Sequence, residues 1–178
     1  RKFFYGYCTP SSNSEYTSRI QTYNAFEDIH YERNSFPAGG YDNVANEYEL
    51  VVIPGDELEF EVSYNLSSFT TRIWVDWNRS LSFEEDEMIF NQHSSTNTVA
   101  SSMTLPLDTE PGTYQMRVRT RWSTTDFGPC DHQSWGSAVD LTLIVIDAPT
   151  CLAPIDLEVL NTYVDGVELT WEDRQDVD

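Results

Sequence analysis

The chain has 178 residues, of which 39% are hydrophobic and 13% aromatic, so it is long and apolar enough for one domain with a packed core. Its formal charge of −20 argues against partners that are bound through Lys and Arg, namely nucleic acid and anionic membrane surfaces. No apolar run approaches the roughly 20 residues that a membrane-spanning helix needs, so we expect no membrane insertion. The sequence starts with neither Met nor a signal-peptide pattern, and we therefore expect a segment of a longer protein or a chain without its leader.

Short stretches with strand-like alternation follow one another along the chain, with Gly, Pro, Asn or Asp between them. They cover residues 48–53, 57–64, 72–77, 98–105, 114–122 and 139–146. Nowhere do apolar residues keep helical spacing for more than two turns. This pattern predicts an all-β fold, namely an antiparallel β-sandwich of the jelly-roll or immunoglobulin-like type.

Two of these strands carry charged stripes. The stretch 57–64 alternates glutamates with apolar residues, and 114–122 places three arginines opposite Met116, Val118 and Trp122. The charged residues are Glu57, Glu59, Glu61, Arg117, Arg119 and Arg121. If the two strands are neighbours, we expect Glu–Arg pairs across the sheet, each worth at most about 1 kcal/mol at an exposed site. The alternative is an arginine ladder that binds an acidic polysaccharide.

The residues from Asp76 to Glu87 have the spacing of a calcium-binding loop. Counting Asp76 as position 1, oxygen-bearing side chains fall at positions 1, 3, 5, 9 and 12, with a backbone carbonyl available at position 7, and such a loop supplies the hard oxygen ligands that Ca²⁺ prefers. The predicted ligands are Asp76, Asn78, Ser80, Ser82 (with its backbone carbonyl), Glu84 and Glu87. Position 6 is Leu81 instead of the glycine that usually makes the sharp turn. The alternative is a polar β-turn with a solvated acidic run.

Exposed aromatic residues raise a second binding hypothesis, a platform that stacks against sugar rings. Alternation places Trp122 inward with Met116 and Val118, and it places Trp77 on the face of Ile73 and Val75. The remaining tryptophans that could be exposed are Trp74 and Trp135. We therefore take Trp74 and Trp135 as the candidate ligand platform.

Five short motifs resemble the GEVED domain, a β-sandwich module of secreted and surface proteins that is common in Bacteroidetes. They are YCTP at residues 7–10, EY at 15–16, WVDWN at 74–78, MRV at 116–118, and Cys130 followed by WGSAVDL at 135–141. Their order and spacing cover roughly residues 5–147. Ser137 and Ala138 replace the two residues after the signature glycine, and Leu141 replaces its tyrosine, so the acidic motif of the family is largely lost here.

The resemblance implies a secreted or cell-surface location and a disulfide between Cys8 and Cys130. Such a bond would close a very long loop and contribute up to roughly 4–5 kcal/mol in the entropic model. Cys151 is the third cysteine, and its partner is expected in the missing remainder of a following domain. The sequence has neither CxxC spacing nor a Cys/His cluster, which argues against a zinc site.

The composition changes after residue 147, where two prolines within six residues indicate a linker over 148–154. The remaining segment, 155–178, resembles the first two strands of a fibronectin type III domain, with a turn at Asp165 and Gly166 and Trp171 as a packing residue. About 25 residues cannot bury such a core alone. We therefore expect this segment to pack on the main domain, or residues 155–172 to pair with a partner by strand addition.

Catalytic motifs are missing from the sequence: His30, His93 and His132 lack paired metal spacing, and neither a GxSxG elbow nor a Gly-rich phosphate loop occurs. We therefore expect a non-catalytic accessory module of a larger secreted or surface-attached bacterial protein, structural or adhesive and stabilised by Ca²⁺. The alternative is a module that binds a glycan or a host or matrix protein, for adhesion or to target an attached enzyme.

Overall fold

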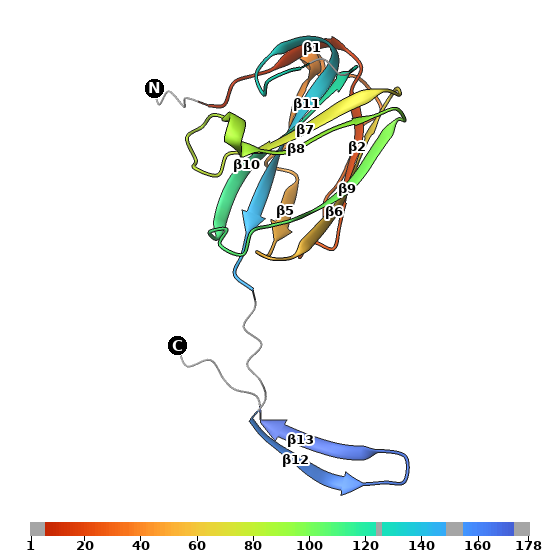
Figure 1. The fold of residues 1–178 in the computed structure, drawn as a ribbon, viewed down its shortest axis with the longest axis vertical. Helices are drawn as coiled ribbons and strands as arrows, with labels where there is room; N and C mark the ends of the chain where they lie inside the picture. The colour runs from red at the N-terminus through yellow and green to blue at the C-terminus, as the bar shows by residue number, and fades with distance from the viewer. Residues whose placement is uncertain (1–5, 124–125, 149–154, 173–178) are drawn as a thin grey trace. The chain divides into compact units, whose positions relative to one another are not determined.

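The computed structural model describes residues 6–123, 126–148 and 155–172. Its contacts divide the chain into two units, the first ending at Asp147 and the second beginning at Ala148. The first unit is a β-sandwich, as predicted, and Figure 1 shows its two sheets packed face to face. No helix in the described part of the chain has the length and apolar character that crossing a bilayer requires.

The larger sheet has seven strands in the order β1-β11-β10-β7-β8, and β4 and β5 also pair with β11. Its strands are β1 (Ser11–Ser14), β4 (Tyr41–Asn43), β5 (Glu49–Val52), β7 (Phe69–Val75), β8 (Met88–Ser94), β10 (Gly112–Trp122) and β11 (His132–Val145). The short 3₁₀ helix η1 (Ala38–Gly40) precedes β4, and η2 (Glu85–Glu87) precedes β8.

The smaller sheet has four antiparallel strands in the order β3-β2-β6-β9. They are β2 (Thr17–Tyr23), β3 (His30–Glu32), β6 (Glu57–Tyr64) and β9 (Thr98–Thr104). The period-two pattern of residues 57–64 predicted the core face of β6 correctly, because Leu58, Phe60 and Val62 are all buried between the sheets.

The pairing along β11 differs from the purely antiparallel arrangement that the sequence suggested. β1, β4 and β5 all run parallel to β11 and occupy its free edge one after another. β11 is 14 residues long, so one short strand cannot cover it. Three short segments divide the edge between them, and this arrangement protects it from pairing with another chain.

The charged stripes do not face each other, so the predicted Glu–Arg pairing is wrong. β6 belongs to the smaller sheet, whereas β10 lies between β11 and β7 in the larger one. The arginine ladder for a polysaccharide is also wrong, because Arg117 and Arg119 are fully buried. Residues 126–131 lie over this face of β10 and accept hydrogen bonds from its arginines. Glu61 instead pairs with Arg19 at 2.6 Å.

The second unit contains one hairpin, β12 (Ile155–Thr162) and β13 (Val167–Glu172), and its turn includes Asp165 and Gly166 as predicted. The apolar side chains described on it are exposed, among them Val159, Leu160 and Val167. Strand addition by residues 155–172 and the fibronectin type III resemblance stay predictions. Cys151 and the side chain of Trp171 lie outside the described residues.

Candidate functional site

The predicted calcium loop connects β7 to β8 and contains η2 at its end. In Figure 1 the loop projects from the sandwich on the side where the N-terminal segment enters. The sharp turn forms without glycine, because Leu81 adopts a left-handed backbone with φ of 67° and Arg79 does the same with φ of 57°. A left-handed conformation costs a residue with a Cβ roughly 1–2 kcal/mol. Such strain is typical of functional loops and is balanced by the contacts around it.

Asp76 is the anchor of the loop. Its carboxylate is fully buried and accepts the backbone N–H groups of Ser80 and Leu81, each at 3.0 Å. The hydroxyl of Tyr7 donates to the same carboxylate at 2.5 Å. Burial, and then the bond to Asp76, raise the pKa of Tyr7 well above its ordinary value of 10.0, so the phenol stays protonated at neutral pH.

Two glutamates complete the acidic centre. Glu87 is buried and accepts the backbone N–H groups of Trp77 and Glu84, each at 3.0 Å, while burial raises the pKa of its carboxyl. Glu84 is half-exposed and accepts hydrogen bonds from the Ser82 hydroxyl, the Ser80 hydroxyl at 3.1 Å and the Asn78 amide at 3.3 Å. The bond from Ser82 is the largest cause, hydrogen bonding with the Glu87 carboxyl is the second, and together with the bonds from Ser80 and Asn78 they lower the pKa of Glu84 to about 2.

The six predicted ligands therefore come together in one place. Asp76, Glu84 and Glu87 each offer a carboxylate oxygen, and these oxygens lie within 4.8 Å of one another. Two oxygens that both contact one Ca²⁺ at 2.3–2.6 Å can be at most about 5 Å apart, so the spacing suits a single ion. The donor set consists of carboxylate, amide and hydroxyl oxygens, which are hard ligands and fit Ca²⁺ better than a softer transition metal.

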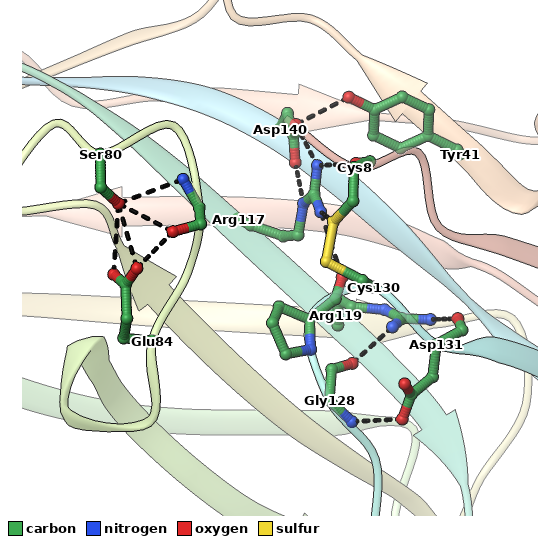
Figure 2. The surroundings of a disulfide bond; sticks show 12 residues. Cys8, Tyr41, Ser80, Glu84, Arg117, Arg119, Gly128, Cys130, Asp131 and Asp140 are labelled. Carbon is green, nitrogen blue, oxygen red and sulfur yellow. Dashed lines mark hydrogen bonds and ion pairs between the residues drawn. A yellow bond between two sulfur atoms is a disulfide. The ribbon is translucent and has the colours of Figure 1, made fainter. Parts of the chain in front are cut away.

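The disulfide implied by the GEVED resemblance is present between Cys8 and Cys130, whose Cα atoms are 5.7 Å apart. Figure 2 shows it beside Arg117, whose guanidinium donates to the carbonyl oxygens of Cys8 at 2.9 Å and Pro129 at 3.1 Å. The disulfide thus joins the N-terminal segment to residues 126–131 over a buried arginine.

Two contacts join the surroundings of the disulfide to the acidic loop. The guanidinium of Arg117 lies 4.8 Å from the ring centre of Phe83, which belongs to the loop. Tyr7, the neighbour of Cys8 in the chain, donates a hydrogen bond to Asp76. Sequence spacing alone could not reveal these contacts, because Tyr7 and Asp76 are 69 residues apart. The signals in the sequence were the family motifs YCTP at 7–10, WVDWN at 74–78 and MRV at 116–118, which contain Tyr7, Asp76 and Arg117.

Arg119, two residues after Arg117 on β10, also binds the segment 126–131. Its guanidinium donates to the carbonyl oxygens of Gly128 at 2.5 Å and Asp131 at 2.9 Å, as Figure 2 shows. Burial lowers the pKa of Arg119 to about 10, so the side chain remains charged at neutral pH. The arginines of β10 therefore organise residues 126–131, and the buried Arg117 and Arg119 are not presented to an external ligand.

The proposed aromatic platform is partly wrong. Trp74 is only 2% exposed and packs in a small cluster with Phe83 and Phe127, because the segment 126–131 covers it. Trp135 is 49% exposed, as expected, and its ring meets that of Trp122 edge to face at 5.4 Å. Trp122 was expected inside but is 45% exposed, because it lies one residue beyond the last pairing of β10 with β11.

Gly136 follows Trp135 and has a structural reason to be glycine. Its φ is 135°, and a Cβ on it would lie 2.0 Å from the carbonyl oxygen of Thr120 on the neighbouring strand. No L side chain fits this close approach. The close backbone contact between β10 and β11 thus requires the glycine of the signature motif. This requirement does not depend on the acidic residues of the motif, which this chain lacks.

Comparison with known proteins finds a family model that is similar to part of this unit. No curated protein matches the chain. Among solved structures, the crystal structure of a CARDB domain from Pyrococcus furiosus, in complex with di-metal ions, is similar at 12% identity and a TM-score of 0.33, over 54% of this chain and 79% of that one. A similarity at that score carries no argument about function. Residues 70–144, which hold β7 to β10, nearly all of β11 and the acidic loop, match the family model of the GEVED domain.

Proposed function

We propose that this chain is a non-catalytic extracellular accessory module of a larger secreted or surface-attached bacterial protein, with a structural or adhesive role and stabilised by Ca²⁺. The GEVED match over residues 70–144 supports the module and its extracellular setting. The disulfide between Cys8 and Cys130 supports the same setting, because disulfides persist in oxidising compartments. The observation that carries the calcium proposal is the convergence of Asp76, Glu84 and Glu87.

The electrostatics of the loop favour a bound cation. Asp76 and Glu87 are buried beside Glu84, and like charges this close repel each other when their carboxylates are ionised. Arg79, the cation of the loop, stacks on the Tyr114 ring at 4.6 Å, and in the described structure no ion pair joins it to the three carboxylates. A Ca²⁺ held by these carboxylates, with Asn78, Ser80 and Ser82 as neutral oxygen donors, would remove the repulsion and fix the β7–β8 connection.

The calcium proposal is tested by thermal unfolding with Ca²⁺, with Mg²⁺ and with a chelator. At a Ca²⁺ concentration of about 100 Kd the linkage is worth about 2.7 kcal/mol, which corresponds to a rise in Tm of roughly 5–10 °C for a chain of this size. Asp76→Asn and Glu87→Gln should abolish the rise. Glu85→Gln and Asp86→Asn are matched controls, because both residues are acidic and exposed in the same loop but lie outside the ligand set.

A calcium-insensitive melting curve, together with no heat of binding in calorimetry, would refute the calcium proposal. The accessory-module proposal is tested separately by expressing the full-length parent protein with and without residues 1–147. Deletion should impair surface retention or stability of the parent and leave the catalytic rate of any attached enzyme domain intact.

Glycan recognition is the second candidate function, and the exposed pair of Trp122 and Trp135 is the observation that favours it. Two large aromatic faces at one end of the larger sheet are unusual on a protein surface, where apolar patches often mark binding sites. A glycan array followed by titration of any hit tests the idea. A saturable signal that Trp135→Ala removes and Phe26→Ala retains supports it, since Phe26 is an equally exposed aromatic residue elsewhere. A blank array rejects it.

A further inference from the structure

The interior of the sandwich contains a cavity of about 270 Å³ between its two sheets. Phe60, Val62 and Met103 line it from the smaller sheet, and Ile73, Met116 and Val118 line it from the larger one. Protein interiors are normally packed so closely that voids larger than a water molecule are few. An engineered apolar cavity of about 150 Å³ stays dry and binds benzene or xenon, so this larger one has room for a small molecule.

The walls of the cavity offer almost no polar group to a ligand. No charged side chain lines it among the described residues. Two threonines line it, Thr22 and the exposed Thr104. The Thr22 hydroxyl donates to Asp28 at 2.9 Å and accepts the Ile29 N–H at 2.9 Å, so its hydrogen bonds are made within the protein. A charged or strongly polar ligand would lose its hydration here without compensation. An apolar ligand gains dispersion contacts with side chains that now face a void.

Three residues separate the cavity from a second hollow. Trp77, Ile89 and Pro106 line both this cavity and the second hollow of about 370 Å³, which also touches Tyr114. The Trp77 ring meets the Tyr114 ring at 5.0 Å. Asp108 and Glu110 line the second hollow, so entry to the cavity from this side is acidic and disfavours anions.

We propose that this cavity is a binding site for one small uncharged apolar molecule, an aromatic ring or a short hydrocarbon chain, which enters past Trp77. The site goes beyond the proposed accessory function and does not depend on calcium. Its volume sets the upper size of the ligand, its apolar walls exclude charge, and the acidic entrance excludes anionic lipids such as fatty-acid carboxylates. The ligand contacts both sheets and therefore stabilises the sandwich when it binds.

The three methionines provide an internal test. Met103 and Met116 line the cavity from opposite sheets, whereas Met88 packs against Trp74 and Phe83 outside it. Protein carrying ¹³C-methyl methionine is titrated with benzene and followed by NMR. We expect the Met103 and Met116 methyl signals to shift saturably and together, with the Met88 signal unchanged. No shift, or equal shifts of all three signals, overturns the proposal.

A filling substitution tests the location of the site. Val118→Phe places a larger side chain in the cavity and should abolish the benzene-induced shift of Met103, while Val159→Phe on the second unit should leave it unchanged. A shift that survives in folded Val118→Phe protein counts against the cavity. If Val118→Phe does not fold, crystals of the unaltered protein under xenon pressure decide. A xenon peak between Val62 and Val118 supports the site, and its absence overturns it.

Discussion

Arg117 and Asp140 face each other on the neighbouring strands β10 and β11 and form a two-pronged ion pair, with Nε–Oδ1 at 2.6 Å and a second guanidinium nitrogen at 2.7 Å from Oδ2. The exposed fractions of the two residues are 0% and 1%. Tyr41 also donates to Asp140 at 2.7 Å. Of the three remaining guanidinium hydrogens, two meet the carbonyl oxygens of Cys8 and Pro129 and the third meets Sγ of Cys8. The pair is thus desolvated but fully hydrogen-bonded, which is the condition under which a buried ion pair is tolerated.

Removing one partner of this pair should be strongly destabilising. Asp140→Ala leaves the Arg117 charge buried without a counterion, and we expect a loss of about 3–5 kcal/mol in the free energy of unfolding, measured in urea. Asp126→Ala is the matched control. Asp126 is 90% exposed and pairs with Arg72 at 2.6 Å, so its removal should cost at most about 1 kcal/mol.

The double substitution Arg117→Met with Asp140→Leu separates charge from packing. It removes both charges and keeps apolar volume, so we expect it to recover much of the stability that Asp140→Ala loses. A double variant as unstable as Asp140→Ala would show that the hydrogen bonds to Cys8, Pro129 and Tyr41 matter more than the unpaired charge.

The disulfide should contribute strongly to stability, because it closes a long loop. Cys8 and Cys130 are 122 residues apart, and the entropic model gives about 4–5 kcal/mol for such a loop. We expect Cys8→Ser with Cys130→Ser to lower the Tm strongly. Adding a reductant should lower the Tm of the unaltered protein to that of the variant and leave the variant unchanged. A reductant effect on the double variant would mean that another thiol equilibrium is involved.

The parts of this molecule that could be predicted from sequence are those that neighbouring residues determine. The alternation of Leu58, Phe60 and Val62 fixes a core face within one strand, so the β-sandwich followed from local pattern. The clustering of Asp76, Glu84 and Glu87 was predictable for the same reason, because the residues that we propose as calcium ligands all lie within the 12 residues from Asp76 to Glu87.

The errors concern which side chains other segments cover. Alternation correctly placed Arg117 and Trp74 away from the space between the sheets, but whether that face meets water depends on residues 126–131, which lie outside both strands. Alternation also placed Trp122 on the face of Val118, but it cannot show that the sandwich ends before that residue. The cavity was equally invisible, since it results from how well two sheets fit and not from the composition of either.

Buried tyrosines should make the protein sensitive to alkaline pH. Burial raises the pKa values of Tyr7, Tyr31, Tyr41 and Tyr64 above the ordinary value of 10.0, and bonds to aspartates contribute for the first three. A tyrosine whose pKa is higher in the folded than in the unfolded state contributes stability that is complete below pH 10. That contribution is lost as the pH rises from 10 through the folded pKa.

We therefore expect absorbance titration of the phenolate to show that these four of the 10 tyrosines resist ionisation in the folded protein and ionise cooperatively with alkaline unfolding. Tyr41→Phe should remove one resistant group. Normal titration of all 10 near pH 10, with the fold intact, would contradict the buried Tyr–Asp bonds.

Leu81 occupies the turn position of the acidic loop where glycine is expected, and its φ of 67° is strained for a residue with a Cβ. Leu81→Gly should relieve that strain. Because the Leu81 side chain is 48% exposed, little packing is lost, and we expect the variant to be up to about 1 kcal/mol more stable in urea. Calcium affinity should stay unchanged if the ion binds to the same turn, because relief of the strain then stabilises the free and the bound state equally. Leu81→Ala removes the same side chain but keeps the Cβ, so it should show no gain in stability, and an equal gain in both variants would mean that the side chain and not the backbone is responsible.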